Sequence, residues 1–141
     1  MKKKFNINYI CEVNYPNSSA YSIHVMKMCD AFREINFNTK LYVPFFSGKT
    51  KKLEIDYNLK NKINIKKIFK KRTKFNFLLR IYYSFNILKN TQGNETLYIS
   101  RSTIFAILAT LINKNIILEL HHPMSGLTKI IFNFFNFLGF L

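Results

Sequence analysis

Hydrophobic residues along this chain follow two spacings that alternate from one segment to the next. Short apolar runs, which are typical of strands, cover residues 5–11, 39–43, 64–69, 97–99 and 116–120. Apolar residues three or four positions apart predict helices over residues 20–36, 75–88 and 103–112, and a last helix from about residue 127. Residues 45–62 are polar and turn-like. This alternation predicts an α/β fold, a Rossmann-like parallel sheet with helices on both faces.

Two of the predicted helices carry an apolar stripe along one side. In the first helix the stripe consists of Val25, Met28, Cys29, Phe32 and Ile35. Ser18 or Ser19 is placed to cap the start of that helix. In the second helix the residues at helical spacing are Leu78, Leu79, Tyr82, Phe85 and Leu88.

In such folds ligands bind at the carboxyl ends of the strands, so the loops after residues 11, 43, 99 and 120 hold the candidate sites. The first loop leads through Asn17, Ser18 and Ser19 into a helix whose first turn includes Ser22. The N–H groups and the positive dipole end of a helix start can hold a phosphate, although an ordinary capped helix has the same sequence pattern. No G-x-G-x-x-G motif is present, and the segment Gly48-Lys49-Thr50 lacks the spacing of a P-loop.

A second group of polar residues follows the last two predicted strands. Glu119 lies between two leucines and faces the interior or a ligand, where a carboxylate needs a partner. Arg101, at the end of the neighbouring predicted strand, is the natural candidate. His121 and His122 come next and can bond a substrate hydroxyl or phosphate, or be satisfied by their own loop. No third ligand lies near them, so no metal site is predicted, and His24 is interpreted as a packed or surface helix residue.

Charge is concentrated in one part of the chain. The 141 residues include 22 basic and 7 acidic residues, for a net charge of +15, and the length suits one domain. Residues 57–94 contain ten of the basic residues and no acidic one, interleaved with Ile and Phe. The candidate binding patch within them consists of Lys66, Lys67, Lys70, Lys71 and Arg72. Such a patch suits nucleic-acid phosphates or anionic lipid, and a solvated loop in a Lys-rich protein has the same composition.

The cysteines and the apolar runs indicate the cellular compartment in which the chain is expected. Cys11 and Cys29 have neither C-x-x-C nor metal-ligand spacing, which predicts two buried thiols in a reducing compartment. Asn6, Asn8 and Glu12 interrupt the first apolar run, which therefore predicts a strand and not a signal peptide. No run of about 18 apolar residues occurs, so no transmembrane helix is expected. The expected location is the cytoplasm, with peripheral contact to the inner face of the membrane.

Three stretches, taken together, extend over most of the chain. They are Asn14-Tyr15-Pro16-Asn17-Ser18-Ser19-Ala20-Tyr21-Ser22 with the helix that follows to Phe32, then Leu97-Tyr98-Ile99-Ser100-Arg101-Ser102, and Ile117-Leu118-Glu119-Leu120-His121-His122-Pro123. In order and spacing they resemble the N-terminal domain of family 4 glycosyltransferases, which have the two-domain GT-B fold. The first and third stretches are fairly specific in combination.

The resemblance implies transfer of a sugar from a nucleotide-sugar donor to a glycan or lipid-linked acceptor in cell-surface polysaccharide synthesis. It implies one catalytic residue, His121, which would contact the transferred sugar or the acceptor. It also implies a set of substrate-binding residues, namely Asn17, Ser18, Ser19, Ser22, Arg101, Glu119 and His122. Family members commonly have Gly in the first loop, where this chain has Ser18-Ser19-Ala20. The leaving nucleoside diphosphate is stabilised electrostatically, so no metal or other cofactor is expected.

The family's donor-binding C-terminal domain, with its E-x7-E pair, has no counterpart in these residues, because no Glu has another Glu eight positions later. We therefore expect residues 1–141 to form one incomplete, acceptor-side domain of a truncated GT-B fold. Such a chain would be inactive alone and would need a separately encoded C-terminal domain. Two alternatives stay open: a non-catalytic basic module that binds nucleic acid or anionic membrane, with nucleic acid the less expected partner, and a non-functional gene remnant.

Overall fold

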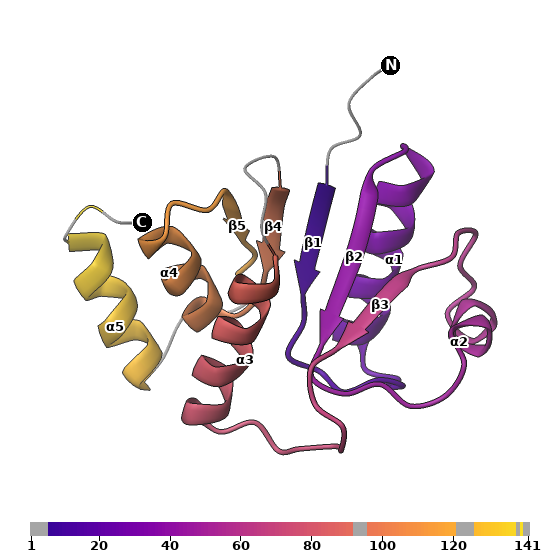
Figure 1. The fold of residues 1–141 in the computed structure, drawn as a ribbon, viewed down its shortest axis with the longest axis horizontal. Coiled ribbons are helices and arrows are strands. Elements are labelled where there is room, and N and C mark those ends of the chain that lie inside the picture. Colours follow the sequence, from indigo (N-terminus) through magenta and orange to yellow (C-terminus); the bar gives the residue numbers. More distant parts are fainter. Residues whose placement is uncertain (1–5, 92–95, 121–125, 138, 140–141) are drawn as a thin grey trace.

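The computed structural model describes residues 6–91, 96–120, 126–137 and 139. Within these ranges the strands are β1 (Asn6–Ile10), β2 (Asn38–Val43), β3 (Asn64–Lys67), β4 (Thr96–Ser100) and β5 (Ile116–Leu118). The helices are α1 (Ala20–Glu34), α2 (Thr50–Asp56), α3 (Phe77–Asn90), α4 (Thr103–Leu111) and α5 (Gly126–Phe137). The strands pair in parallel in the order β3-β2-β1-β4-β5, with helices on both faces of the sheet (Figure 1). The predicted Rossmann-like α/β fold is confirmed.

The direction of strand addition reverses at β1, which lies at the centre of the sheet. The chain moves outward from β1 through β2 to β3 and then returns to place β4 on the other side of β1. Ile7 accordingly pairs with Thr39 of β2 on one side and with Leu97 of β4 on the other. In open α/β sheets the crevice beyond the carboxyl ends of the strands at such a reversal is where ligands bind. The topology therefore points to the loops after β1 and β4.

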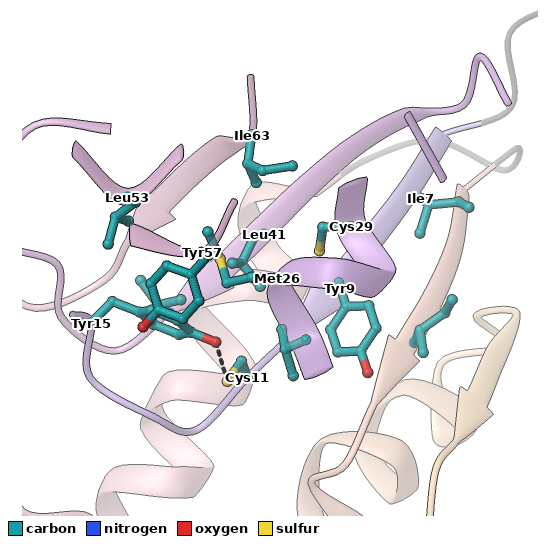
Figure 2. Close-up of a cluster of buried hydrophobic side chains, with 13 residues drawn as sticks. Ile7, Tyr9, Cys11, Tyr15, Met26, Cys29, Leu41, Leu53, Tyr57 and Ile63 are labelled. Carbon is teal, nitrogen blue, oxygen red and sulfur yellow. Dashed lines mark hydrogen bonds between the residues drawn. The ribbon is translucent and has the colours of Figure 1, made fainter. Parts of the chain in front are cut away.

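Two apolar cores hold the helices against the two faces of the sheet. On one face, α1 and α2 cover a cluster that includes Tyr9 and Cys11 (Figure 2). On the other face, α3 and α4 cover a cluster that includes Ile10 and Tyr98. Tyr9 and Ile10 belong to different cores because successive strand residues point to opposite faces. Cys11 and Cys29 are buried free thiols, which confirms their predicted burial.

Two segments differ from what the sequence pattern predicts. Residues 45–62 were expected to be polar and turn-like, but they contain α2, in which Leu53 is the buried residue. One buried side chain in a short helix leaves no apolar period for a pattern to detect. The last strand was expected to be buried, but β5 is an edge strand in which Ile117 is 49% exposed. An apolar run has the same composition at the edge of a sheet as at its centre, so the sequence could not separate the two.

The apolar stripe predicted for α3 lies mainly on its outer side. Leu78, Tyr82 and Phe85 are each more than half exposed, whereas Tyr83, outside that stripe, is fully buried. Ile35, the last residue of the α1 stripe, is also exposed, because it follows the end of α1 as its C-cap. Despite these apolar surfaces, no helix in the described ranges is long and apolar enough to span a membrane.

Candidate functional site

A pocket of about 680 Å³ opens beyond the carboxyl ends of β4 and β5, against the start of α1. It is lined by Ala20, Tyr21, His24, Arg101, Thr103, Glu119 and Leu120. These residues come from the beginning of α1, the loop after β4, the start of α4 and the loop after β5. The pocket therefore lies where the strand order reverses, which is the ligand position expected for this fold.

Glu119 is the centre of a polar cluster in this pocket. Its Oε2 accepts hydrogen bonds from the Tyr9 hydroxyl at 2.6 Å and from Nε of Arg101 at 2.9 Å. Nε2 of His24 lies 3.9 Å from the same oxygen. The N–H of Glu119 donates to the Ser100 carbonyl at 2.8 Å, which extends the pairing of β4 with β5 by one residue. The pairing of Arg101 with Glu119 expected from the sequence is thus present, and the fold adds Tyr9 from β1 and His24 from α1 to it.

The surroundings of Glu119 keep its carboxyl group ionised. Burial by itself raises the pKa of Glu119, but the hydrogen bonds from Tyr9 and Arg101 and the charge of Arg101 together lower that pKa below its ordinary value. Burial, reinforced by the hydrogen bond to Glu119, raises the pKa of Tyr9 well above its ordinary value. Tyr9 therefore acts as a neutral donor and Glu119 as a fixed negative acceptor, which suits a ligand rich in hydroxyl groups.

Arg101 is held in place from two sides. Its Nε donates to Glu119, and its Cζ lies 4.6 Å from the centre of the Tyr21 ring in a cation–π contact. The side chain of Arg101 is 11% exposed and that of Glu119 is 20% exposed, so the ion pair is mostly withdrawn from water. The pocket thus combines an aromatic wall with a few oriented charged groups, which is typical of small-molecule sites.

The loop between β1 and α1 forms a hydrogen-bonded turn. Ser19 is the N-cap of α1, as predicted, and its Oγ accepts from the N–H of Ser22 at 3.2 Å. Ser22 is buried, and its hydroxyl donates to the Asn17 carbonyl at 2.6 Å. The same carbonyl accepts a hydrogen bond from the Tyr57 hydroxyl. These bonds give the loop a defined shape before any ligand arrives.

The candidate residues of this loop are separated from the Glu119 pocket. Asn17 and Ser18 line a different pocket of about 560 Å³, together with Lys27 and Tyr57. The two other serines are engaged in the cap of α1. From the start of α1, the two residues that follow the cap, Ala20 and Tyr21, line the Glu119 pocket. The structure therefore brings together Arg101 and Glu119 but not the serines.

The basic patch lies on β3 and in the loop that follows it. Its members are all exposed, namely Lys66, Lys67, Lys70, Lys71 and Arg72. Strand β3 forms one edge of the sheet, whereas the Glu119 pocket lies beyond the carboxyl ends of β4 and β5, on the other side of β1. The structure therefore does not unite the patch and the pocket in one site.

Two predicted site residues, His121 and His122, lie outside the described residues. His24 was interpreted from the sequence as a packed or surface residue, yet it contributes to the pocket wall and approaches Glu119. Its position one helical turn after Tyr21 was the available sequence signal. In the described part of the chain, no group of three or more His, Cys, Asp and Glu side chains is arranged to hold a metal ion.

No protein-family model, curated protein or solved structure matches this chain. The fold and the pocket are therefore the observations that bear on its function. Together they define a Rossmann-like α/β domain with a pocket that contains the Arg101–Glu119 ion pair at the point where strand order reverses.

Proposed function

We propose that this chain is the N-terminal, acceptor-side part of a glycosyltransferase. The enzyme would move a sugar from a nucleotide-sugar donor to a glycan or lipid-linked acceptor in cell-surface polysaccharide synthesis. The observation that carries the proposal is the pair formed by Glu119 and Arg101, which Tyr9 orients in a pocket at the strand-order reversal. The three sequence stretches that resemble family 4 glycosyltransferases support the same proposal.

The chemistry of the pocket fits the recognition of a hydroxyl-bearing acceptor. The Glu119 carboxylate can accept hydrogen bonds from sugar hydroxyls, and a guanidinium such as that of Arg101 donates to oxygen atoms. Tyr21 adds an aromatic wall against which the apolar face of a sugar ring can pack. Because Arg101 and Glu119 hold each other at 2.9 Å, little side-chain entropy is lost when a ligand binds.

The donor would approach from the side of α1. The first turn of α1 borders the pocket, and the partial positive charge of a helix start favours an anionic diphosphate. Glu119 is negative and close to this turn, so it disfavours a diphosphate deep in the pocket and favours the neutral acceptor there. In a GT-B enzyme the donor is held chiefly by the second domain, and transfer occurs in the cleft between the two domains.

Ligand binding to the 141-residue chain tests this proposal. The probes are uridine and guanosine diphosphate sugars and short neutral oligosaccharides, and binding is followed by amide-proton NMR shifts. We expect an oligosaccharide to shift the signals of Tyr21, Arg101 and Glu119. The variant Glu119→Gln should bind it at least about tenfold more weakly, because a charge-assisted hydrogen bond is lost.

Glu34→Gln is the matched control for this experiment. Glu34 is likewise a glutamate in an ion pair, because it lies 3.0 Å from Nζ of Lys60. It is exposed at the end of α1 and does not line the Glu119 pocket. Its replacement should leave oligosaccharide binding unchanged. The proposal is wrong if no probe shifts the pocket signals, or if Glu34→Gln and Glu119→Gln weaken binding equally.

A further inference from the structure

The helices α3, α4 and α5 lie side by side (Figure 1). Their side chains line an apolar groove. The groove has a volume of about 280 Å³. It is lined only by apolar side chains, namely Phe77, Ile81, Phe85, Ile104, Ile107, Leu108, Leu111, Ile131 and Phe135. A groove without polar groups offers a peptide or sugar no hydrogen bonds that would fix its orientation. It therefore suits an apolar ligand that needs no fixed orientation.

The surface around this groove is also apolar. On α3, Leu78, Tyr82 and Phe85 are 73%, 56% and 55% exposed, and on α5 the exposed fractions are 58% for Phe134 and 88% for Phe137. Single exposed apolar residues are ordinary, but a patch that extends over neighbouring helices marks an interaction surface. We call the outer side of α3, α4 and α5 the helical face.

The charges near the helical face are mainly positive, although Arg80 of α3 pairs with Glu12 at 3.5 Å. The sequences of α3, α4 and α5 contain no Asp or Glu and three basic residues, namely Arg80, Lys89 and Lys129. The loop that leads into α3 adds four exposed basic residues, namely Lys70, Lys71, Arg72 and Lys74. A partner of this face must therefore tolerate or prefer positive charge, which an anionic surface does.

Aromatic contacts fix the basic loop against α3. Phe69 stacks on Tyr82 with ring centres 6.0 Å apart, and Phe75 meets Tyr83 edge-on at 5.4 Å. These two phenylalanines bracket the basic residues of the loop, so the loop is held at both ends beside the start of α3. The basic loop and the helical face consequently form one continuous surface.

We propose that the helical face docks on an anionic phospholipid bilayer. The apolar side chains of α3 and α5 enter the boundary between headgroups and acyl chains, while the basic loop contacts the lipid phosphates. Charge complementarity favours anionic lipid over a second copy of this chain, because the second copy would carry the same excess of positive charge. Apolar burial and electrostatic attraction then act on the same surface.

Docking in this orientation leaves the Glu119 pocket accessible. The helical face and α1 lie on opposite faces of the sheet, and α1 forms one wall of the pocket. Among the residues that the structure describes, the two surfaces adjoin at the start of α4, where Thr103 lines the pocket and Ile104 lines the groove. Bilayer docking is independent of sugar transfer, so either proposal can fail without the other.

Tryptophan fluorescence tests the docking directly, because the chain contains no Trp of its own. Phe85→Trp and Phe134→Trp place one reporter on α3 and one on α5, and Ile55→Trp is the control on α2, where Ile55 is 73% exposed. The vesicles contain equal parts of phosphatidylglycerol and phosphatidylcholine. With these vesicles we expect emission to move to shorter wavelength for both helical-face reporters and to stay unchanged for the control.

The electrostatic part is tested by neutralising the loop. Lys70→Gln with Lys71→Gln should weaken partition into the anionic vesicles by about 25-fold, at about fivefold for each charge removed. Lys51→Gln with Lys52→Gln, a pair of exposed residues on α2, is the matched control and should change partition by less than about threefold. Added salt should weaken binding of the unchanged chain.

Several outcomes would overturn the docking proposal. One is an emission shift in the Ile55→Trp control that equals that of the other reporters. Another is an emission shift that depends on protein concentration and needs no vesicles, which would assign the face to a second copy. Equal partition into pure phosphatidylcholine would remove the role of anionic lipid. Tighter binding of a short RNA than of vesicles, abolished by the same loop variant, would assign the basic loop to nucleic acid.

Discussion

The helices α1 and α3 flank the same sheet and make opposite use of their outer surfaces. They have 15 and 14 residues, and each starts with a side-chain cap, Ser19 in α1 and Asn76 in α3. On α1 the exposed side chains that line the Glu119 pocket are Ala20 and His24. On α3 the exposed side includes Leu78 and Tyr82. The same architectural role therefore produces a polar wall on one face and an apolar surface on the other.

An apolar stripe therefore has a different structural role in each of the two helices. In α1 the stripe marks contact with the sheet, since Val25 and Cys29 are fully buried. In α3 the helix also contacts the sheet, through Tyr83 and Ile87, but apolar residues continue around to the outside. A helix that is apolar on more than one side can make a second apolar contact besides that with the sheet. For α3 we have inferred that the second partner is a bilayer.

The largest expected effect is the difference in stability lost when a side chain is truncated on the buried side of α1 and on the outer side of α3. Met26 is fully buried, so Met26→Ala should destabilise the fold by about 2–5 kcal/mol through lost burial and a residual cavity. Leu78→Ala should change the free energy of unfolding by less than about 0.5 kcal/mol, because Leu78 is 73% exposed. Urea denaturation of both variants measures the contrast. Equal losses would mean that the outer side of α3 is packed in solution.

A smaller effect concerns the pocket and depends on pH. The folded-state pKa of Glu119 is lowered, so its ionised form stabilises the fold above the ordinary carboxyl pKa of about 4.3, and this contribution disappears as the pH falls through the folded-state value. Glu119→Gln should therefore cost about 1–2 kcal/mol at pH 7 and almost nothing in acid. Urea denaturation at a series of pH values measures this loss. A cost that does not change with pH would show that the ion pair with Arg101 contributes nothing to stability.

The smallest expected difference lies in the two helix caps. Oγ of Ser19 accepts from the N–H of Ser22 at 3.2 Å, and Oδ1 of Asn76 accepts from the N–H of Leu79 at 2.8 Å. Ser19→Ala and Asn76→Ala should each destabilise the fold by about 1 kcal/mol. Thermal unfolding should show nearly equal shifts for the two variants. A much larger shift for Ser19→Ala would mean that the cap also holds the loop of Asn17.

Much of the fold could be predicted from spacing, but the surroundings of each element could not. The strands and the four longer helices follow from local period, and the cap at Ser19 follows from local chemistry. The helix α2 was not predicted, because Leu53 is its only buried residue and leaves no apolar period in the sequence. The edge position of β5 was not predicted, because it depends on whether another strand pairs beside β5 in the sheet. The local sequence around Ile117 does not encode that property.

The candidate site was predictable only in part for a related reason. Arg101 and Glu119 could be paired because Arg101 lies at the end of one predicted strand and Glu119 near the end of its neighbour, and parallel strands place their carboxyl ends at one edge. Tyr9 points toward Glu119 from a strand 110 positions earlier in the sequence, and no local pattern marks that contact. His24 reaches the same carboxylate from α1. Contacts of such long sequence separation depend on strand order.

Local sequence pattern accounts for the alternation of strands and helices, the burial of the two thiols and the excess of positive charge. These are local or summed properties, which side-chain chemistry and period specify without reference to distant residues. Strand order is needed to bring the Tyr9 hydroxyl and Nε of Arg101 to the carboxylate of Glu119, and to leave most of the α3 stripe facing outward. Both outcomes depend on the order in which strands join the sheet, because that order decides which side chains meet and which faces stay uncovered.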